Sequence, residues 1–348
     1  MKAVVFRKHG GPEVLEYADV PDPSPGPGHA LIRVAACSLN HLDVWIRQGI
    51  PAYQITLPHI SGCDVAGVIE RLGPGVNDLK LGARVFVAPG LSCFACDACR
   101  SGDDNLCASY GIFGARTDGG YAELALARAG DLIPIPDGVS FEEAAAFPLV
   151  FLAAWHMLMT RAGLRSGETV LVQAAGSGIG HAAVQIAKLA GAIVYATVGS
   201  EPKIAQAQAL GADAVFDHSR DDVLSRIHEL TQRLGVDVVF EHVGPQTWDT
   251  SLKALKKGGR LVTCGATTGP SVALDLRYAF SRQLTILGSM MGTRAELLVL
   301  TRLIGQRRLR PVIDTVFPLS EARAAQQRLL DRQVFGKLLL APAAPRPA

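Results

Sequence analysis

The chain has 348 residues, which is enough for two domains of ordinary size, and 49% of them are hydrophobic. A formal net charge of +2 without a basic run argues against nucleic acid as a partner. The 36 glycines are typical of an α/β protein with many tight strand-to-helix turns.

The N-terminal segment, MKAVVFRKHG, has too short an apolar stretch for an export signal, and it is predicted to form a strand. The longest apolar run, residues 144–159, has only 16 residues and is interrupted by Pro148 and His156. A membrane-spanning helix needs roughly 20 apolar residues, so we expect this run to be a buried core segment. These features predict a cytoplasmic protein that does not contact a membrane and whose thiols stay reduced.

Four of the seven cysteines lie in one short stretch, LSCFACDACRSGDDNLC, at Cys93, Cys96, Cys99 and Cys107. Four soft thiolates at this spacing suit tetrahedral zinc. Disulfides fit a reducing compartment poorly, the spacing matches neither common iron–sulfur run, and no basic helix follows that could read DNA. Because four protein ligands complete a tetrahedron, the predicted zinc is structural and fixes a lobe of about residues 91–110.

A glycine-rich turn lies in residues 168–180, ETVLVQAAGSGIG, between a predicted strand at 169–173 and a helix. In such a turn, backbone N–H groups and the helix N-terminus hold a pyrophosphate. The predicted contacts are Gly176, Ser177, Gly178, Ile179 and Gly180. The glycine spacing departs from the usual G-x-G-x-x-G, so a tight turn without a ligand stays an alternative.

Strands and helices alternate after this turn. Short apolar strands are predicted at 193–198, 214–216, 236–243, 260–266 and 284–289, with helices near 201–210, 220–234 and 246–257. Together with the strand at 169–173, they predict a doubly wound, six-stranded parallel sheet. Right-handed crossovers place the C-terminal ends of all strands at one edge, where a dinucleotide would bind.

The end of the second strand bears on the choice of dinucleotide. Gly199 stands where an acidic residue would bind the ribose 2′-hydroxyl of NAD. Ser200 and Lys203 follow, and His218 comes after the third strand, a set that suits a 2′-phosphate. We therefore expect NADP(H), with NAD(H) as the alternative. Glu201 is either the acid displaced by one residue or an ordinary residue of the first helical turn.

The cysteine stretch ahead of a six-stranded nucleotide fold resembles the medium-chain dehydrogenase/reductase superfamily, which includes zinc alcohol dehydrogenases and quinone oxidoreductases. Further segments also resemble this superfamily: MKAVVF, GGPEVLE, ALIRVAACSLNHLDVWIRQG, LPHISGCDVAGVIERLGPGV, DGGYAEL, AGLRSGETVLVQAAGSGIG and VFGKLLL. The resemblance implies a β-rich, GroES-like catalytic domain at residues 1–150, a Rossmann domain at 151–288, and a C-terminal segment, 289–348, that returns to the first domain.

Several site features follow from this resemblance. It implies an active site in the cleft between the domains, a small-molecule substrate and a homodimer or homotetramer. It also places four residues near the nicotinamide of the cofactor: Gly265, Ala266, Ser289 and Met290. Val243, at the end of another predicted strand, is a further expected cofactor contact.

The catalytic-zinc ligands of the alcohol dehydrogenase pattern are missing from the expected positions. Asn40 occupies the first, Gly62-Cys63-Asp64 stands in place of Gly-His-Glu, and Leu149 falls near the third. Leu42 occupies the position of the proton-relaying hydroxyl. The best remaining ligand set would combine Cys63 and Asp64 with His59 or His41.

Without a Lewis acid at this site, oxidation of an ordinary alcohol is difficult, whereas reduction of an electron-poor acceptor is easier. We therefore expect an NAD(P)H-dependent reductase of quinones or α,β-unsaturated carbonyl compounds. Asn40 is expected to donate a hydrogen bond to the substrate carbonyl, and Tyr53 is the nearest candidate acid. An alcohol dehydrogenase with atypical metal ligands and a non-catalytic NADPH-binding protein are the alternatives.

Overall fold

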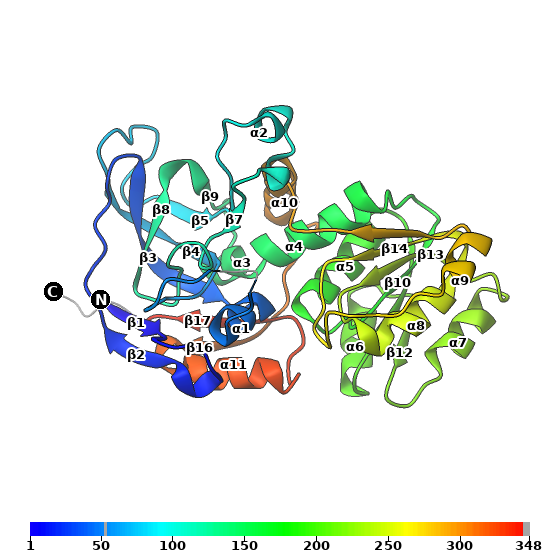
Figure 1. Ribbon diagram of the computed structural model, residues 1–348. Helices are drawn as coiled ribbons and strands as arrows, with labels where there is room; N and C mark the ends of the chain where they lie inside the picture. The colour runs from blue at the N-terminus through cyan, green and yellow to red at the C-terminus, as the bar shows by residue number, and fades with distance from the viewer. Residues whose placement is uncertain (52–53, 344–348) are drawn as a thin grey trace. The chain divides into compact units, whose positions relative to one another are not determined.

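A computed structural model describes residues 1–51 and 54–343 of the chain (Figure 1). It divides into two compact units, one formed by Met1–Leu149 with Thr293–Ala348 and the other by Val150–Gly292. The first unit therefore contains both ends of the chain, and the second is inserted between them. The predicted boundaries, 150 and 288, lie one and four residues from the observed ones.

The first unit is built around a predominantly antiparallel sheet in the order β16-β17-β3-β4-β5-β9, with β8 paired to β3. The predicted N-terminal strand forms a separate hairpin, β1 with β2, and β6 pairs with β7. The strands of this unit are β1 (Lys2–Val5), β2 (Glu16–Asp19), β3 (His29–Ser38), β4 (Asp64–Leu72), β5 (Arg84–Val87), β6 (Gly90–Leu91), β7 (Gly111–Ile112), β8 (Leu124–Arg128), β9 (Leu132–Pro134), β16 (Ile313–Pro318) and β17 (Lys337–Ala341).

Short helices connect these strands. They are α1 (His41–Gln48), α2 (Asp97–Ser101), α3 (Phe141–Ala146), α4 (Pro148–Trp155), which crosses the boundary between the units, α10 (Arg294–Gly305), α11 (Ala322–Leu330), and the 3₁₀ turns η1 (Pro12–Val14), η2 (Asp104–Leu106), η3 (Ala129–Asp131) and η5 (Leu319–Glu321). The C-terminal strand β17 lies antiparallel to β3, with Leu339 opposite Ser38 and Leu340 opposite Cys37. This pairing brings the end of the chain beside the residues that follow β3.

The second unit is a six-stranded parallel sheet in the order β12-β11-β10-β13-β14-β15. This is the doubly wound order 3-2-1-4-5-6 of a dinucleotide-binding fold. The elements are β10 (Thr169–Val172), α5 (Gly178–Leu189), β11 (Ile193–Val198), α6 (Pro202–Ala209), β12 (Ala214–Asp217), α7 (Val223–Leu230), β13 (Val236–Glu241), α8 (Pro245–Ala254), β14 (Leu255–Thr263), α9 (Leu276–Ser281), β15 (Thr285–Gly288) and the π-helical turn η4 (His156–Arg161).

One predicted boundary in this unit is wrong. The helix expected at 246–257 ends at Ala254, and β14 begins at Leu255 rather than at 260. The register of β13 and β14 shifts between Val236 and Val238, which adds an irregular start to the strand. A fully buried Leu255, opposite Val236 in the sheet, favours strand over a further helical turn.

The apolar run at 144–159 is divided between α3, α4 and η4, and most of its side chains are buried. Among the described residues, no helix is long and apolar enough to cross a bilayer.

Candidate functional site

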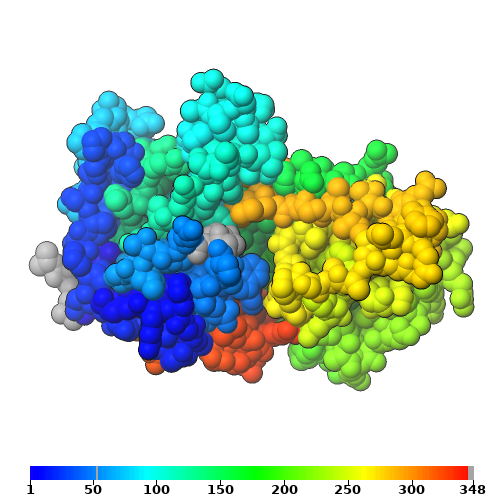
Figure 2. All heavy atoms as spheres, viewed as in Figure 1, coloured from blue at the N-terminus to red at the C-terminus, as the bar shows by residue number. Residues whose placement is uncertain are grey.

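The cysteine lobe is a loop of the first unit, closed at its base by the pairing of β6 with β7. Figure 2 shows the lobe as a cyan projection at the top of the view. Between these two strands the chain forms only short turns, α2 and η2. Neither turn buries a residue of its own, so a lobe of this kind depends on another source of stability.

The four cysteines of the lobe are grouped closely enough to supply that stability through a bound metal ion. All seven cysteines lie in the described part of the chain, and each is a free thiol. The ligand atoms of Cys93, Cys96, Cys99 and Cys107 lie within 4.8 Å of one another. Two of the Sγ–Sγ distances, Cys93 to Cys99 and Cys96 to Cys99, are 3.8 and 3.5 Å. Tetrahedral zinc with bonds of about 2.3 Å separates its sulfur ligands by about 3.8 Å, so the quartet fits the ion.

Hydrogen bonds lower the pKa of two of these thiols, which favours their binding to a cation. The Cys93 sulfur accepts from the backbone N–H groups of Ala95 and Cys96, at 3.4 and 3.3 Å, and these bonds lower its pKa. A side-chain hydrogen bond with Ser109 lowers the pKa of Cys107 to about 6. Burial raises the pKa of Cys99 to about 11, so a bound cation would have to displace that proton.

The lobe is anchored to α10, which lies below α2 in Figure 1. The backbone N–H of Arg294 donates to Asp104 Oδ1 at 2.9 Å. The ring of Phe94 lies 5.7 Å from the Arg294 guanidinium and 5.2 Å from that of Arg128. These contacts link the lobe to the C-terminal segment of the chain, which returns to the first unit at Thr293.

In the second unit, the predicted glycine turn connects β10 to α5. Ser177 is the N-cap of α5, and its Oγ accepts from the backbone N–H of Gly180 at 2.9 Å. An added Cβ at Gly180 would lie 2.2 Å from the Ala174 carbonyl oxygen, so only glycine allows the helix to approach the strand this closely. Gly176, Gly178 and Ile179 complete the turn. The first helical turn and its N–H groups form a cradle that fits a pyrophosphate.

A buried network of polar side chains is hydrogen-bonded to this turn, and it was not predicted from the sequence. Gln173 donates to Ser251 Oγ at 3.0 Å and accepts from Thr197 Oγ1 at 2.8 Å. Thr197 Oγ1 also accepts from the backbone N–H of Ala174 at 2.9 Å, which connects the network to the turn. Ser251 donates to the fully buried carboxylate of Glu241 at 2.6 Å. The polar residues at the ends of neighbouring strands are the sequence feature from which this network could have been predicted.

The residues predicted for the adenosine end lie at the C-terminal ends of β11 and β12. A Cβ added at Gly199 would lie 3.3 Å from His218 Nε2, so these two residues are neighbours. Glu201 is paired with Arg220 at 2.7 Å, and both side chains are exposed. Arg220 was not predicted from the sequence, although it follows the third strand by only three residues. The cations near this edge are therefore Lys203, which is half-buried, and Arg220, which is exposed.

Val243, a predicted cofactor contact, follows β13, and the residues predicted for the nicotinamide end follow β14 and β15. Thr268 N donates to the Val243 carbonyl at 2.8 Å, and Ser289 N donates to that of Thr263 at 2.9 Å. A Cβ at Gly265 would lie 2.6 Å from the His242 carbonyl oxygen. Ala266 follows Gly265, and Met290 is 51% exposed. The loops after these three strands are thus joined to one another or to the sheet by backbone hydrogen bonds and close packing.

Asn40 lies in the first unit, at the N-terminus of α1. Its backbone N–H donates to Asp43 Oδ2 at 2.7 Å, which fixes the start of the helix. Its side chain is 5% exposed. The Nδ2 group donates to Asp64 Oδ2 at 2.8 Å and to Cys63 Sγ at 3.3 Å. The Oδ1 atom accepts from Lys337 Nζ at 2.6 Å.

Asp64 is the centre of the surrounding network. The backbone N–H of Leu149 donates to Asp64 Oδ1 at 2.9 Å, and Ser38 Oγ donates to Oδ2 at 3.3 Å. Burial raises the pKa of Asp64 and lowers that of Lys337. Burial also raises the pKa of the Cys63 thiol, so this cysteine remains protonated near neutral pH.

The positions that hold a catalytic zinc in the alcohol dehydrogenase pattern thus converge, but their residues do not fit the ion. Asn40 and Leu149 offer no thiolate or imidazole, and Cys63 is a protonated thiol beside an amide. Over residues 1–51 and 54–343, the four lobe cysteines are the one group of three or more His, Cys, Asp or Glu side chains with ligand atoms close enough for a metal. His59 is hydrogen-bonded to the Gly114 carbonyl at 2.9 Å. Tyr53 lies outside the described residues.

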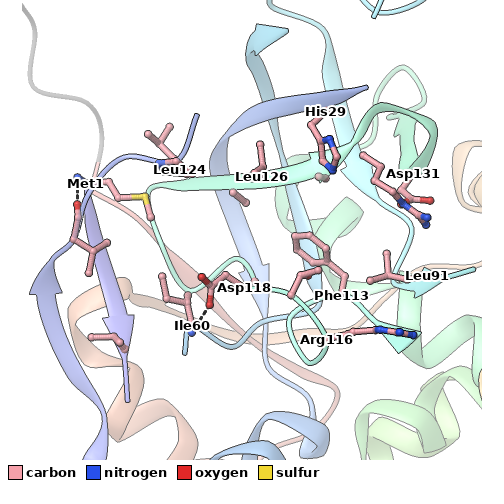
Figure 3. A pocket seen from close by; sticks show the side chains of 18 of the residues that line it. Met1, His29, Ile60, Leu91, Phe113, Arg116, Asp118, Leu124, Leu126 and Asp131 are labelled. Atoms are coloured by element: carbon pink, nitrogen blue, oxygen red, sulfur yellow. Dashed lines mark hydrogen bonds and ion pairs between the residues drawn. The ribbon is translucent and has the colours of Figure 1, made fainter. Parts of the chain in front are cut away.

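A cavity of about 880 Å³ opens in the first unit beside β8 (Figure 3). Leu124, Leu126 and Phe113 line it together with Arg116 and Asp118. None of the lining residues belongs to the Asn40 network, so the cavity is separate from the convergent positions described above.

Known proteins resemble this chain in both sequence and structure. The family described as "Alcohol dehydrogenase GroES-like domain" matches residues 26–137, and "Zinc-binding dehydrogenase" matches residues 178–305. A crotonyl-CoA reductase of Streptomyces avermitilis is 34% identical over 94% of this chain and 82% of its own. A quinone oxidoreductase of Rattus norvegicus is 32% identical over 98% and 97%. A solved NAD-dependent alcohol dehydrogenase has a TM-score of 0.94 and 45% identity, over 98% of this chain and 99% of that one.

The fold and these matches define an NAD(P)-dependent oxidoreductase that acts on small molecules. The chain belongs to the medium-chain dehydrogenase/reductase superfamily. The predicted family and the fold class, a GroES-like domain with a six-stranded Rossmann domain, are confirmed.

Proposed function

We propose that this protein reduces a quinone or an α,β-unsaturated carbonyl compound with NADPH, and that it uses one structural zinc and no catalytic zinc. The observation that carries the proposal is the donor set at the convergent positions: an amide, a protonated thiol and a lysine-paired carboxylate instead of zinc ligands. The names of two relatives, crotonyl-CoA reductase and quinone oxidoreductase, support the same class of acceptor.

Asn40 would stabilise the negative charge that develops on the substrate oxygen. When bound, the nicotinamide supplies a hydride, which adds to the β-carbon of an enone while the π electrons shift toward the carbonyl oxygen. The Asn40 Nδ2 group would donate a hydrogen bond to that oxygen in place of its 3.3 Å hydrogen bond to Cys63 Sγ. This is the longer of the two hydrogen bonds that the group donates. A proton from water or Tyr53 completes the reduction. When the acceptor is a quinone, the negative charge from the hydride develops on its oxygens, and both oxygens carry a proton in the quinol product.

The cofactor would be held by the second unit. Gly176, Ser177, Gly178, Ile179 and Gly180 cradle its pyrophosphate. Residues at or just after the ends of β11 and β12 would hold the 2′-phosphate of NADP: Ser200, Lys203, His218 and Arg220. The loops that carry Val243, Gly265, Ala266, Ser289 and Met290 contact the nicotinamide end. NADPH is favoured because no acidic side chain follows β11 directly and Glu201 is engaged by Arg220.

The structural zinc is proposed for Cys93, Cys96, Cys99 and Cys107. It would replace the apolar core that the lobe lacks. Purified protein should contain one zinc per chain, and a Cys99→Ser variant should contain almost none.

The decisive experiment follows NADPH oxidation with 1,2-naphthoquinone and 2-alkenals, and NAD(P)⁺ reduction with primary and secondary alcohols, alongside zinc content. Turnover of electron-poor acceptors with one zinc per chain is the expected result. Alcohol oxidation with two zinc ions per chain would instead establish the alternative, an alcohol dehydrogenase with atypical ligands, which the name of the 45% identical structure favours. Saturable NADPH binding without turnover would identify a binding protein.

A homodimer or homotetramer is also proposed. The strand β15 ends the six-stranded sheet and has a single neighbour, β14. Five exposed apolar residues fall in and around α9 and β15: Val272, Leu276, Phe280, Ile286 and Met290. An edge strand with exposed apolar residues favours pairing with a second copy.

A further inference from the structure

Lys337 is a buried lysine of the Asn40 network, with 2% of the residue exposed. It begins β17, and the backbone N–H of Leu39 donates to the Leu338 carbonyl at 2.8 Å beside it. The Lys337 ammonium donates to the Leu39 carbonyl at 2.7 Å and to Asn40 Oδ1 at 2.6 Å. The strand β17 thus places an ammonium group against Asn40, the residue proposed to contact the substrate.

The acceptors of this ammonium distinguish it from an ordinary buried ion pair. Both short hydrogen bonds go to neutral oxygens, whereas Asp64 Oδ2 lies 3.8 Å away, beyond hydrogen-bonding distance. A lysine whose only role was to neutralise Asp64 would donate to the carboxylate directly. Asp64 instead receives hydrogen bonds from Asn40, Ser38 and the Leu149 backbone.

The ammonium also determines the orientation of the Asn40 side-chain amide. An ammonium can only donate, so it selects the oxygen end of the amide. The nitrogen end then faces Cys63 and Asp64. A hydrogen bond from a cation to the amide oxygen polarises the amide and strengthens its N–H groups as donors.

We propose that Lys337 is the resident cation of this site: it orients Asn40 and supplies positive charge where the alcohol dehydrogenase pattern places a metal. The inference rests on the proposed function, in which Asn40 contacts the substrate oxygen. Lys337 is accordingly a positioning residue that acts through Asn40. It also explains why the ligand positions can converge without a metal, since a second cation beside the ammonium would be repelled.

Cobalt binding tests the charge without any turnover. Asn40→Cys would place a second thiol beside Cys63 and Asp64. We expect Co²⁺ titration to give one ion per chain, in the lobe, for the wild type, Lys337→Met and Asn40→Cys. Asn40→Cys/Lys337→Met should bind a second ion and show a second thiolate-to-cobalt absorption band. A second cobalt in Asn40→Cys alone with the same affinity would overturn the proposal, as would its absence from the double variant.

Kinetics test the orientation of Asn40. Lys337→Met leaves Asp64 unpaired, so it is combined with Asp64→Asn to keep the fold, which circular dichroism checks. We expect kcat for the acceptor to fall at least about tenfold while the dissociation constant for NADPH stays unchanged. The primary isotope effect with deuterated NADPH should rise, and Lys337→Arg should retain most of kcat. An unchanged kcat in the folded double variant would refute the positioning role. If the wild type reduces no such acceptor, the proposed function fails, and the cobalt result stands by itself.

Discussion

Asp43 shows how a single buried carboxylate holds the loops of the first unit together. Its Oδ2 accepts from the Tyr121 hydroxyl at 3.0 Å as well as from the Asn40 backbone, and its Oδ1 accepts from Gly62 N at 3.2 Å. These bonds fix α1 and the Gly62–Cys63 segment in place next to the Asn40 network. Burial nevertheless raises the pKa of Asp43 from 3.8 to about 6, because the desolvation of the charged form outweighs the donors.

This raised pKa predicts a pH-dependent stability. Between pH 3.8 and about 6 the folded protein keeps a proton on Asp43 that the unfolded chain releases. The contribution of this group to the free energy of unfolding is therefore fully present below that range. It should fall by roughly 3 kcal/mol as the pH rises through the range. Urea unfolding of the wild type and Asp43→Asn, at several pH values, measures the difference.

The unfolding free energy of the wild type relative to Asp43→Asn should be highest at acidic pH and should fall, in favour of the variant, as the pH rises toward neutral. An Asp78→Asn control removes an exposed carboxylate instead. A difference between wild type and Asp43→Asn that does not vary with pH would show that Asp43 ionises normally in the folded protein.

At the scale of elements, the junction between β10 and α5 carries the cofactor proposal. The strand ends where Gln173 joins the buried network, and the helix begins at the Ser177 N-cap. Ala174 adopts a φ of 49°, which turns the chain sharply between them. Gly180 then lets the first helical turn pack onto the strand, which sets the position of the α5 N-terminus, where we propose that the pyrophosphate binds.

A Gly180→Ala variant should therefore lose dinucleotide affinity. Its new methyl group would lie 2.2 Å from the Ala174 carbonyl oxygen and 2.8 Å from Ala175 Cα, so the helix must shift away from the strand. We expect the dissociation constant for NADPH, from a fluorescence titration, to rise at least about tenfold. Gly130→Ala is the matched control, since nothing lies within 4 Å of its added Cβ. Equal affinity in the two variants would argue against a cradle at this turn.

For the whole molecule, assembly is the property most directly open to test. Two exposed apolar side chains, Phe280 in α9 and Ile286 in β15, are 70% and 37% exposed. Leu234, at 71%, is equally exposed but lies between α7 and β13, away from the edge strand. The comparison of these positions separates a general effect of surface charge from a specific interface.

Sedimentation velocity should show a dimer or tetramer for the wild type. Phe280→Glu/Ile286→Glu should sediment as a smaller species, because two buried charges would oppose pairing at this edge. Leu234→Glu should keep the wild-type assembly. A monomeric wild type, or an unchanged assembly in the double variant, would exclude β15 as the interface.

The sequence by itself determined the features that depend on local spacing. The cysteine quartet, the glycine turn and the six strands of the second unit are each written in residues close together in the chain. The start of β14 was missed, because packing opposite Val236 overrides the helical pattern there. The tertiary structure alone decided which distant groups meet. Lys337 and Asn40 are 297 residues apart, and the pairing of β17 with β3 brings them together. Neither burial nor the direction of an ammonium can be inferred from a lysine within VFGKLLL, since both depend on a strand pairing that local sequence does not specify.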